Sequence, residues 1–107
     1  MNINSYIEKV KLDPENIIDI PEKYRTIYIC KEALKQDPMA LGYVPENIMT
    51  YNMCLDAVRR NGAALEFVPE KFKSYEICLE AVNEYSLALE LFVPDKFKNI
   101  GDDKKHV

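Results

Sequence analysis

A period of 24 residues runs through most of this 107-residue chain. Three cysteines and three prolines keep the same step, and a fourth proline follows one residue late. These positions are Cys30, Cys54 and Cys78, then Pro21, Pro45 and Pro69, and finally Pro94. A fixed period in this range is typical of repeat proteins, whose units are too small to bury their own apolar faces and stack on their neighbours. The spacing therefore predicts a repeat architecture.

Each copy carries the same helix signals. Thr26, Thr50 and Ser74 occupy one position, where a hydroxyl group can cap the helix that follows. Apolar residues then recur at steps of three and four, as in Tyr75, Cys78 and Val82. The helix should end near Asp37-Pro38, Asn61-Gly62 and Tyr85-Ser86, and a helix of one to two turns and a proline-led turn should follow. The sequence therefore predicts an all-α, α-solenoid-like helical-repeat array, whose hand it does not determine.

The copies divide the chain into about four units of 24 residues within one domain, residues 1–100. The units span residues 1–19, 20–43, 44–67 and 68–99. The first unit is a degenerate copy of the repeat. Asp13-Pro14 lies 24 residues before Asp37-Pro38, but Tyr6 replaces the repeated cysteine. Terminal repeats are expected to be atypical because one face meets water. Residues 101–107 are interpreted as a charged, mobile tail.

The cysteines and the large side chains favour structural roles. One cysteine per repeat does not give the closely spaced ligand pairs of a zinc site, so we expect buried, reduced thiols and no metal or other cofactor. The bulky residue after each proline-led turn should fill the gap between successive units. These residues are Tyr24, Ile48, Phe72 and Phe97. The acidic positions recur in every copy, which a structural role predicts and a single catalytic site does not.

The composition narrows the choice of partners. The net charge is −4 and the sequence pI is about 5.0, so the chain lacks the basic excess of a generic nucleic-acid binder. No apolar run approaches the length of a membrane span, and the N-terminal residues do not resemble a signal peptide. We therefore expect a cytoplasmic protein that contacts neither nucleic acid nor membrane, with its oligomeric state left open.

The run from Tyr75 to Val82 and the Val-Pro motif of each unit resemble a bacterial family of short helical repeats of unknown function. Its units read roughly as aromatic-x-x-C-L-x-A-V followed by N-G-x-A-L-x-x-V-P, and the resemblance spans about residues 20–99. The sequence departs from this pattern in the copy at residues 20–43, which has Lys31 at the position of Leu55 and Leu79, and Pro38 at the position of Gly62. The resemblance implies an α-helical array used inside bacteria or their mobile elements, and it transfers no catalytic residue.

Positions where the copies differ are the candidates for partner binding, because positions that serve the stacking of units should carry similar residues in every copy. Arg59-Arg60 is the basic pair of the predicted helices. Together with three further residues it defines a candidate Tyr/Arg interface patch, of a composition that often anchors protein interfaces. The patch consists of Arg25, Tyr28, Lys35, Arg59 and Arg60. Ordinary variation of a solvated surface is the alternative interpretation.

Two functional hypotheses follow. The first is a non-catalytic protein–protein interaction module, which uses the extended surface of a repeat array to bind a protein partner. The second is a small phage or mobile-element inhibitor of a host nucleic-acid-targeting defence nuclease, an anti-CRISPR-like role exerted by steric occlusion. The small size and the acidic charge motivate it. An enzyme is not expected, because the sequence has no glycine-rich phosphate loop and its one histidine, His106, lies near the C-terminus.

Overall fold

The long helices begin where the sequence places their caps. The computed structural model describes residues 3–100, and its ten-residue helices are α1 (Ile3–Leu12), α2 (Ile27–Gln36), α3 (Tyr51–Arg60) and α4 (Tyr75–Glu84). The hydroxyl groups of Thr26, Thr50 and Ser74 accept hydrogen bonds from the backbone N–H three residues on, at 3.5, 3.2 and 3.2 Å. The predicted caps are confirmed, and so are the three predicted helix ends.

The second element of each unit is tighter than expected. The first three units contain a six-residue 3₁₀ helix: η1 (Pro14–Asp19), η3 (Pro38–Tyr43) and η5 (Gly62–Phe67). The side chains of Asp13, Asp37 and Asn61 each accept a hydrogen bond from the N–H two residues on, at 2.9, 2.9 and 3.0 Å. This local bond ends the preceding helix and starts a new turn. Only the last unit has a short α-helix here, α5 (Ala88–Leu91).

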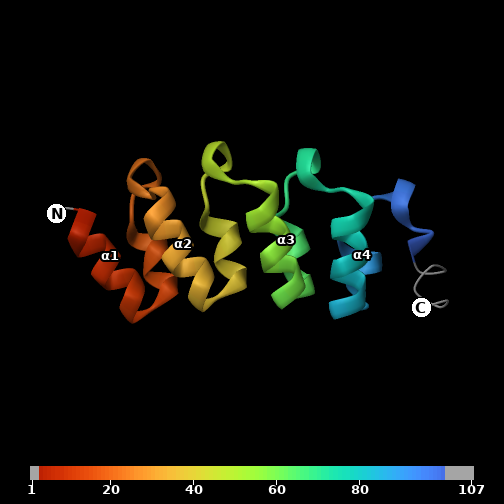
Figure 1. Cartoon of the computed structure of the whole chain (residues 1–107), viewed down its shortest axis with the longest axis horizontal. Helices are drawn as coiled ribbons and strands as arrows, with labels where there is room; N and C mark the ends of the chain where they lie inside the picture. The colour runs from red at the N-terminus through yellow and green to blue at the C-terminus, as the bar shows by residue number, and fades with distance from the viewer. Residues whose placement is uncertain (1–2, 101–107) are drawn as a thin grey trace.

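A three-residue 3₁₀ helix follows each repeated proline. These are η2 (Glu22–Tyr24), η4 (Glu46–Ile48), η6 (Glu70–Phe72) and η7 (Asp95–Phe97). Proline fixes the backbone for the turn and has no N–H to leave unpaired. The four turns lie along one long edge of the molecule, the upper edge in Figure 1; we call it the proline edge.

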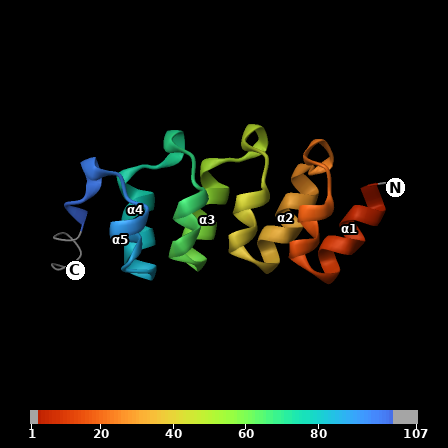
Figure 2. The same ribbon diagram turned by 180° about the vertical axis from the view of Figure 1, so that it is seen from behind.

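The helices stand in two rows. Helices α1 to α4 follow one another from the N-terminal to the C-terminal end (Figure 1), and η1, η3, η5 and α5 form a second row behind them (Figure 2). The described residues form helices and the turns that connect them, without a strand. The molecule measures 52 × 23 × 19 Å with a radius of gyration of 15.0 Å, against about 13 Å for a compact domain of this length. The molecule is therefore elongated along the direction in which helices α1 to α4 follow one another. Residues 1–2 and the proposed tail lie outside the described residues.

One continuous apolar core runs between the rows. It takes equivalent residues from successive units, such as Ile17, Leu41 and Leu65, each fully buried. The three cysteines are also fully buried, as the sequence predicts. The aromatics close the core at the proline edge: Tyr51 meets Phe72 and Tyr75 meets Phe97 edge to face, with ring centroids 6.4 and 5.9 Å apart.

The gap-filling role predicted for Tyr24 holds only in part. Its ring stacks on that of Tyr6 with the centroids 6.1 Å apart, yet the residue is 45% exposed. Its partner Tyr6 lies at the repeated cysteine position, whereas Tyr51 and Tyr75, the partners of Phe72 and Phe97, lie three residues before that position in their helices. Tyr24 therefore covers the edge of the core and does not enter it.

The buried thiols should make the protein sensitive to alkali. Burial raises the pKa of Cys30 and Cys54 from 9.0 to about 11 and raises that of Cys78. Between pH 9 and 11 the unfolded chain therefore loses the thiol protons of Cys30 and Cys54 that the folded chain keeps, and stability falls as the pH rises through this range. Urea denaturation at pH 8 and 10 measures the loss. A variant with all three cysteines replaced by alanine should lose less stability over this range, and an equal loss would contradict the assignment.

Candidate functional site

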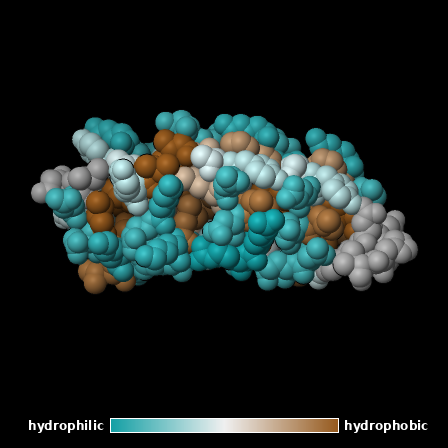
Figure 3. All heavy atoms as spheres, viewed as in Figure 1, coloured by the Kyte–Doolittle hydropathy of each residue, from teal (hydrophilic) through white to brown (hydrophobic). Residues whose placement is uncertain are grey.

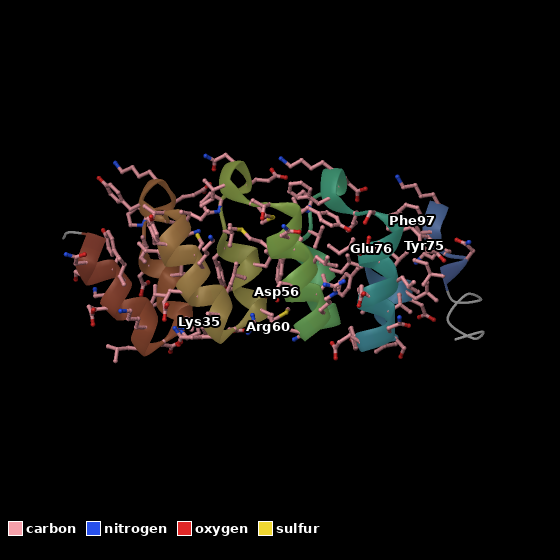
Figure 4. The ribbon with its side chains drawn as sticks, in the orientation of Figure 1. Lys35, Asp56, Arg60, Tyr75, Glu76 and Phe97 are labelled. Carbon is pink, nitrogen blue, oxygen red and sulfur yellow. The ribbon has the colours of Figure 1, made fainter. Side chains whose placement is uncertain are left out.

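The outward face between α2 and α3 contains an open hollow of about 460 Å³. Lys31, Leu34 and Lys35 line it from α2, and Met53, Asp56 and Arg60 line it from α3. Figure 4 shows Lys35 and Arg60 at the lower edge of the molecule, with Asp56 above them. We call these six residues the α2–α3 hollow.

The hollow lies where the repeat is broken. The position of Lys31 holds Ile7 in α1, Leu55 in α3 and Leu79 in α4, and each of these apolar side chains packs against the core. Lysine at this position keeps its ammonium group in water and leaves the space beside it unfilled. In agreement, α2 and α3 approach each other less closely than α1 and α2 or α3 and α4. Lys31 and the wider separation of the two helices therefore coincide at this pair of units.

Arg60 ties the two sides of the hollow together. Its guanidinium group donates hydrogen bonds to the backbone carbonyls of Leu34 and Lys35, at 2.5 and 3.0 Å, and lies 3.5 Å from the carboxylate of Asp56. The carbonyls belong to the last turn of α2, where a positive charge is favoured by the helix dipole. The equivalent Gln36 donates to the carbonyl of Val10 at 2.9 Å. This position therefore links neighbouring units as well as facing solvent.

Replacing Arg60 with alanine should cost stability even though the residue is on the surface. The change removes two charge-assisted hydrogen bonds to helix-terminal carbonyls, so we expect a loss of about 1.5–3 kcal/mol in the free energy of unfolding. Arg59→Ala removes exposed ion pairs only and should cost below about 1 kcal/mol. Urea denaturation of the two variants makes the comparison. Equal losses would contradict the linking role of Arg60.

The face between α3 and α4, which corresponds to the hollow between α2 and α3, is closed by ion pairs. Arg59 lies 3.4 Å from the carboxylate of Glu80 and 3.9 Å from that of Glu76. The equivalents of Arg59 and Glu80 across the hollow are Lys35 and Asp56, which form no ion pair with each other. Within residues 3–100, neither Lys31 nor Lys35 has an ion-pair partner.

The five residues predicted from sequence to form one Tyr/Arg patch do not lie together. Lys35 and Arg60 meet in the hollow, whereas Arg59 pairs across α3 and α4. Arg25 lies beside the proline edge and donates to the carbonyls of Ile20 and Tyr43 at 2.9 and 3.1 Å. It also donates to Ile18 at 3.4 Å, so it links successive units as Arg60 does.

Tyr28 extends the face of the hollow. It is 77% exposed, and steps of three and four place it on the same side of α2 as Lys31 and Lys35. On this side of the molecule polar side chains cover much of the surface, with apolar patches showing between them (Figure 3).

Sequence reasoning about binding residues missed Lys31, Met53 and Asp56. The signal for Lys31 was present, because it is the one charged residue at a position that is apolar in the other three units. Met53 and Asp56 gave no such signal, since their equivalents Ile77 and Glu80 have similar character. Their place in the hollow depends on the separation of the two helices.

Residues 3–100 bring together no three histidine, cysteine or acidic side chains that could hold a metal ion. No helix in this range has the length and apolar character to cross a membrane.

Comparison with known proteins finds a family match over part of the chain. Residues 51–98 are similar to the family described as a domain of unknown function (DUF4116). The matched segment begins at α3, includes α4 and ends after η7. No curated protein and no solved structure matches the chain.

Proposed function

We propose that this chain is a helical-repeat, α-solenoid-like array of four 24-residue units that acts as a non-catalytic protein–protein interaction module. The repeated order of a ten-residue helix, a shorter helix and a proline-led 3₁₀ turn supports the array. Each unit contributes equivalent residues to one core, and the elongated shape offers more surface than a compact domain of this length. The similarity of residues 51–98 to a domain family of unknown function is compatible with the short-repeat family that the sequence resembles.

The observation that carries the binding proposal is the α2–α3 hollow. Stacking alone favours the same apolar filler in every unit, and three of the four units have it. Lys31 departs from this pattern and opens a concave surface with two ammonium groups that form no ion pair within residues 3–100. A departure that sacrifices packing without serving the fold is typical of a functional position. The backbone around the hollow is already ordered, so docking a partner there loses little entropy.

Affinity capture from a bacterial lysate, followed by mass spectrometry, tests the proposal. The wild-type chain is compared with Lys31→Leu, which restores the residue of Leu55 and Leu79. We expect one dominant protein on the wild-type chain and much less of it on the variant. Absence of any protein above the empty resin would contradict a binding function. Equal retention by both chains would contradict only the assignment of binding to the hollow. A nucleic-acid-cleaving enzyme as the partner would support the inhibitor hypothesis.

A further inference from the structure

The charge of the hollow is opposite to that of the whole protein. Three cationic side chains and one carboxylate line it, in a chain with a net charge of −4. The carboxylate of Asp56 is already 3.5 Å from the guanidinium group of Arg60. The ammonium groups of Lys31 and Lys35 therefore remain available to an incoming anion.

The ion-paired face between α3 and α4 supports the view that Lys31 and Lys35 receive an anion from outside the chain. Between α3 and α4, Glu80 lies at the position equivalent to Asp56 and reaches Arg59, and Glu76 adds a second carboxylate. Among the described residues, the chain thus supplies its own carboxylates to the face between α3 and α4, whereas the equivalent cation between α2 and α3, Lys35, has no ion-pair partner. A carboxylate from outside the chain would complete at Lys35 the pairing that Glu80 completes at Arg59.

The hollow also has an apolar floor. Leu34 is 7% exposed, and Met53 is half-buried against the core. Methionine adapts to varied side chains, which suits a contact surface. A ligand that fits both features carries an acidic group next to an aliphatic one.

We propose that the α2–α3 hollow binds an acidic segment of a partner protein, with an Asp or Glu carboxylate between Lys31 and Lys35 and a neighbouring aliphatic side chain on Leu34 and Met53. This inference rests on the proposed binding function and names the chemistry of the partner. Nucleic acid fits less well, because a phosphate backbone continuing along the same row of helices meets the exposed carboxylates of Asp56 and Glu76, with side chains 68% and 64% exposed.

Selection from a random 12-residue peptide library displayed on phage, with the wild-type chain as bait, tests the inference. Selected peptides are then synthesised with a fluorescent label, and their affinities are measured by anisotropy. The hollow variant is Lys31→Glu with Lys35→Glu. The matched control is Lys71→Glu with Lys96→Glu, which changes the net charge equally at exposed residues of the proline edge. Circular dichroism verifies that both variants fold.

We expect selected peptides rich in Asp or Glu beside Leu, Ile, Val or Met. The hollow variant should bind them about tenfold or more weakly than the wild-type chain, and the control within about threefold. Peptides without acidic residues would overturn the inference, and so would equal weakening by both variants. In either case the binding function stands, because a peptide still binds. If the selection yields no peptide, the inference is overturned, and the lysate capture then tests the binding function separately. Tighter binding of a labelled single-stranded oligonucleotide, lost in the hollow variant, would overturn the inference in favour of nucleic acid.

Discussion

Replacing Gly62 with alanine should lower the free energy of unfolding by about 3 kcal/mol, the upper end of the usual cost of overpacking. A Cβ atom at this position would lie 2.4 Å from the backbone carbonyl oxygen of Ala81 and 2.8 Å from Cβ of Tyr85. Neither atom belongs to the flexible end of a side chain, so η5 and α4 must move apart. The cause is the close approach of two units and not the backbone conformation, because Gly62 does not have a positive φ.

Gly42→Ala is the control for this prediction. Its Cβ would meet the ring of Phe67 at 2.9 Å, and a ring at the end of a side chain can turn aside. We therefore expect a loss of about 1 kcal/mol or less. Thermal unfolding measures both variants, and the Gly62 variant should melt roughly 10 °C or more below the wild-type chain. A Gly62 variant at least as stable as the wild-type chain would contradict the close contact between η5 and α4.

Truncating Leu65 to alanine should cost about 3–4 kcal/mol. Leu65 is fully buried in η5, and removing three of its side-chain carbon atoms leaves a cavity that a closely packed core fills only in part. Leu41 in η3 lies at the equivalent position of the preceding unit and is also fully buried. If the interior units are structurally equivalent, Leu41→Ala should cost a similar amount.

Leu12→Ala provides the matched control for the two core variants. It makes the same chemical change at a leucine that is 85% exposed, so stability should change by about 0.5 kcal/mol or less. Urea denaturation gives all three values. Losses at Leu41 and Leu65 that differ by more than about 2 kcal/mol, or that do not exceed the loss at Leu12, would contradict an equivalent core position.

The sequence predicts the helical elements well because their signals are local. A hydroxyl group before an apolar helix and an Asp-Pro or Asn-Gly pair after it act on neighbouring backbone groups, so Thr26, Asp37 and Asn61 have the effects that their chemistry predicts. The recurrence of each signal strengthens the prediction. The 3₁₀ geometry of η1, η3 and η5 was less accessible, since few residues separate the helix end from the next proline.

The candidate site was harder to predict because it depends on how neighbouring units meet. Arg25 and Arg60 seemed free for a partner, yet Arg25 donates to the backbone carbonyl of Ile18 in the preceding unit, and Arg60 donates to the carbonyls of Leu34 and Lys35. No local pattern shows which carbonyl a long side chain will reach. Lys31 was visible as a departure from the repeat, but its consequence appears only when α2 and α3 lie side by side.

All of these expectations depend on the units following one another in a row, so that equivalent positions meet equivalent neighbours. Small-angle X-ray scattering of the purified monomer tests that arrangement most directly. We expect a radius of gyration of at least the 15.0 Å of the Cα atoms and a longest dimension of at least 52 Å, with a pair-distance distribution skewed towards long distances. A radius of gyration of about 13 Å with a symmetric distribution, as for a compact domain of this length, would contradict the stacked array and the α2–α3 hollow with it.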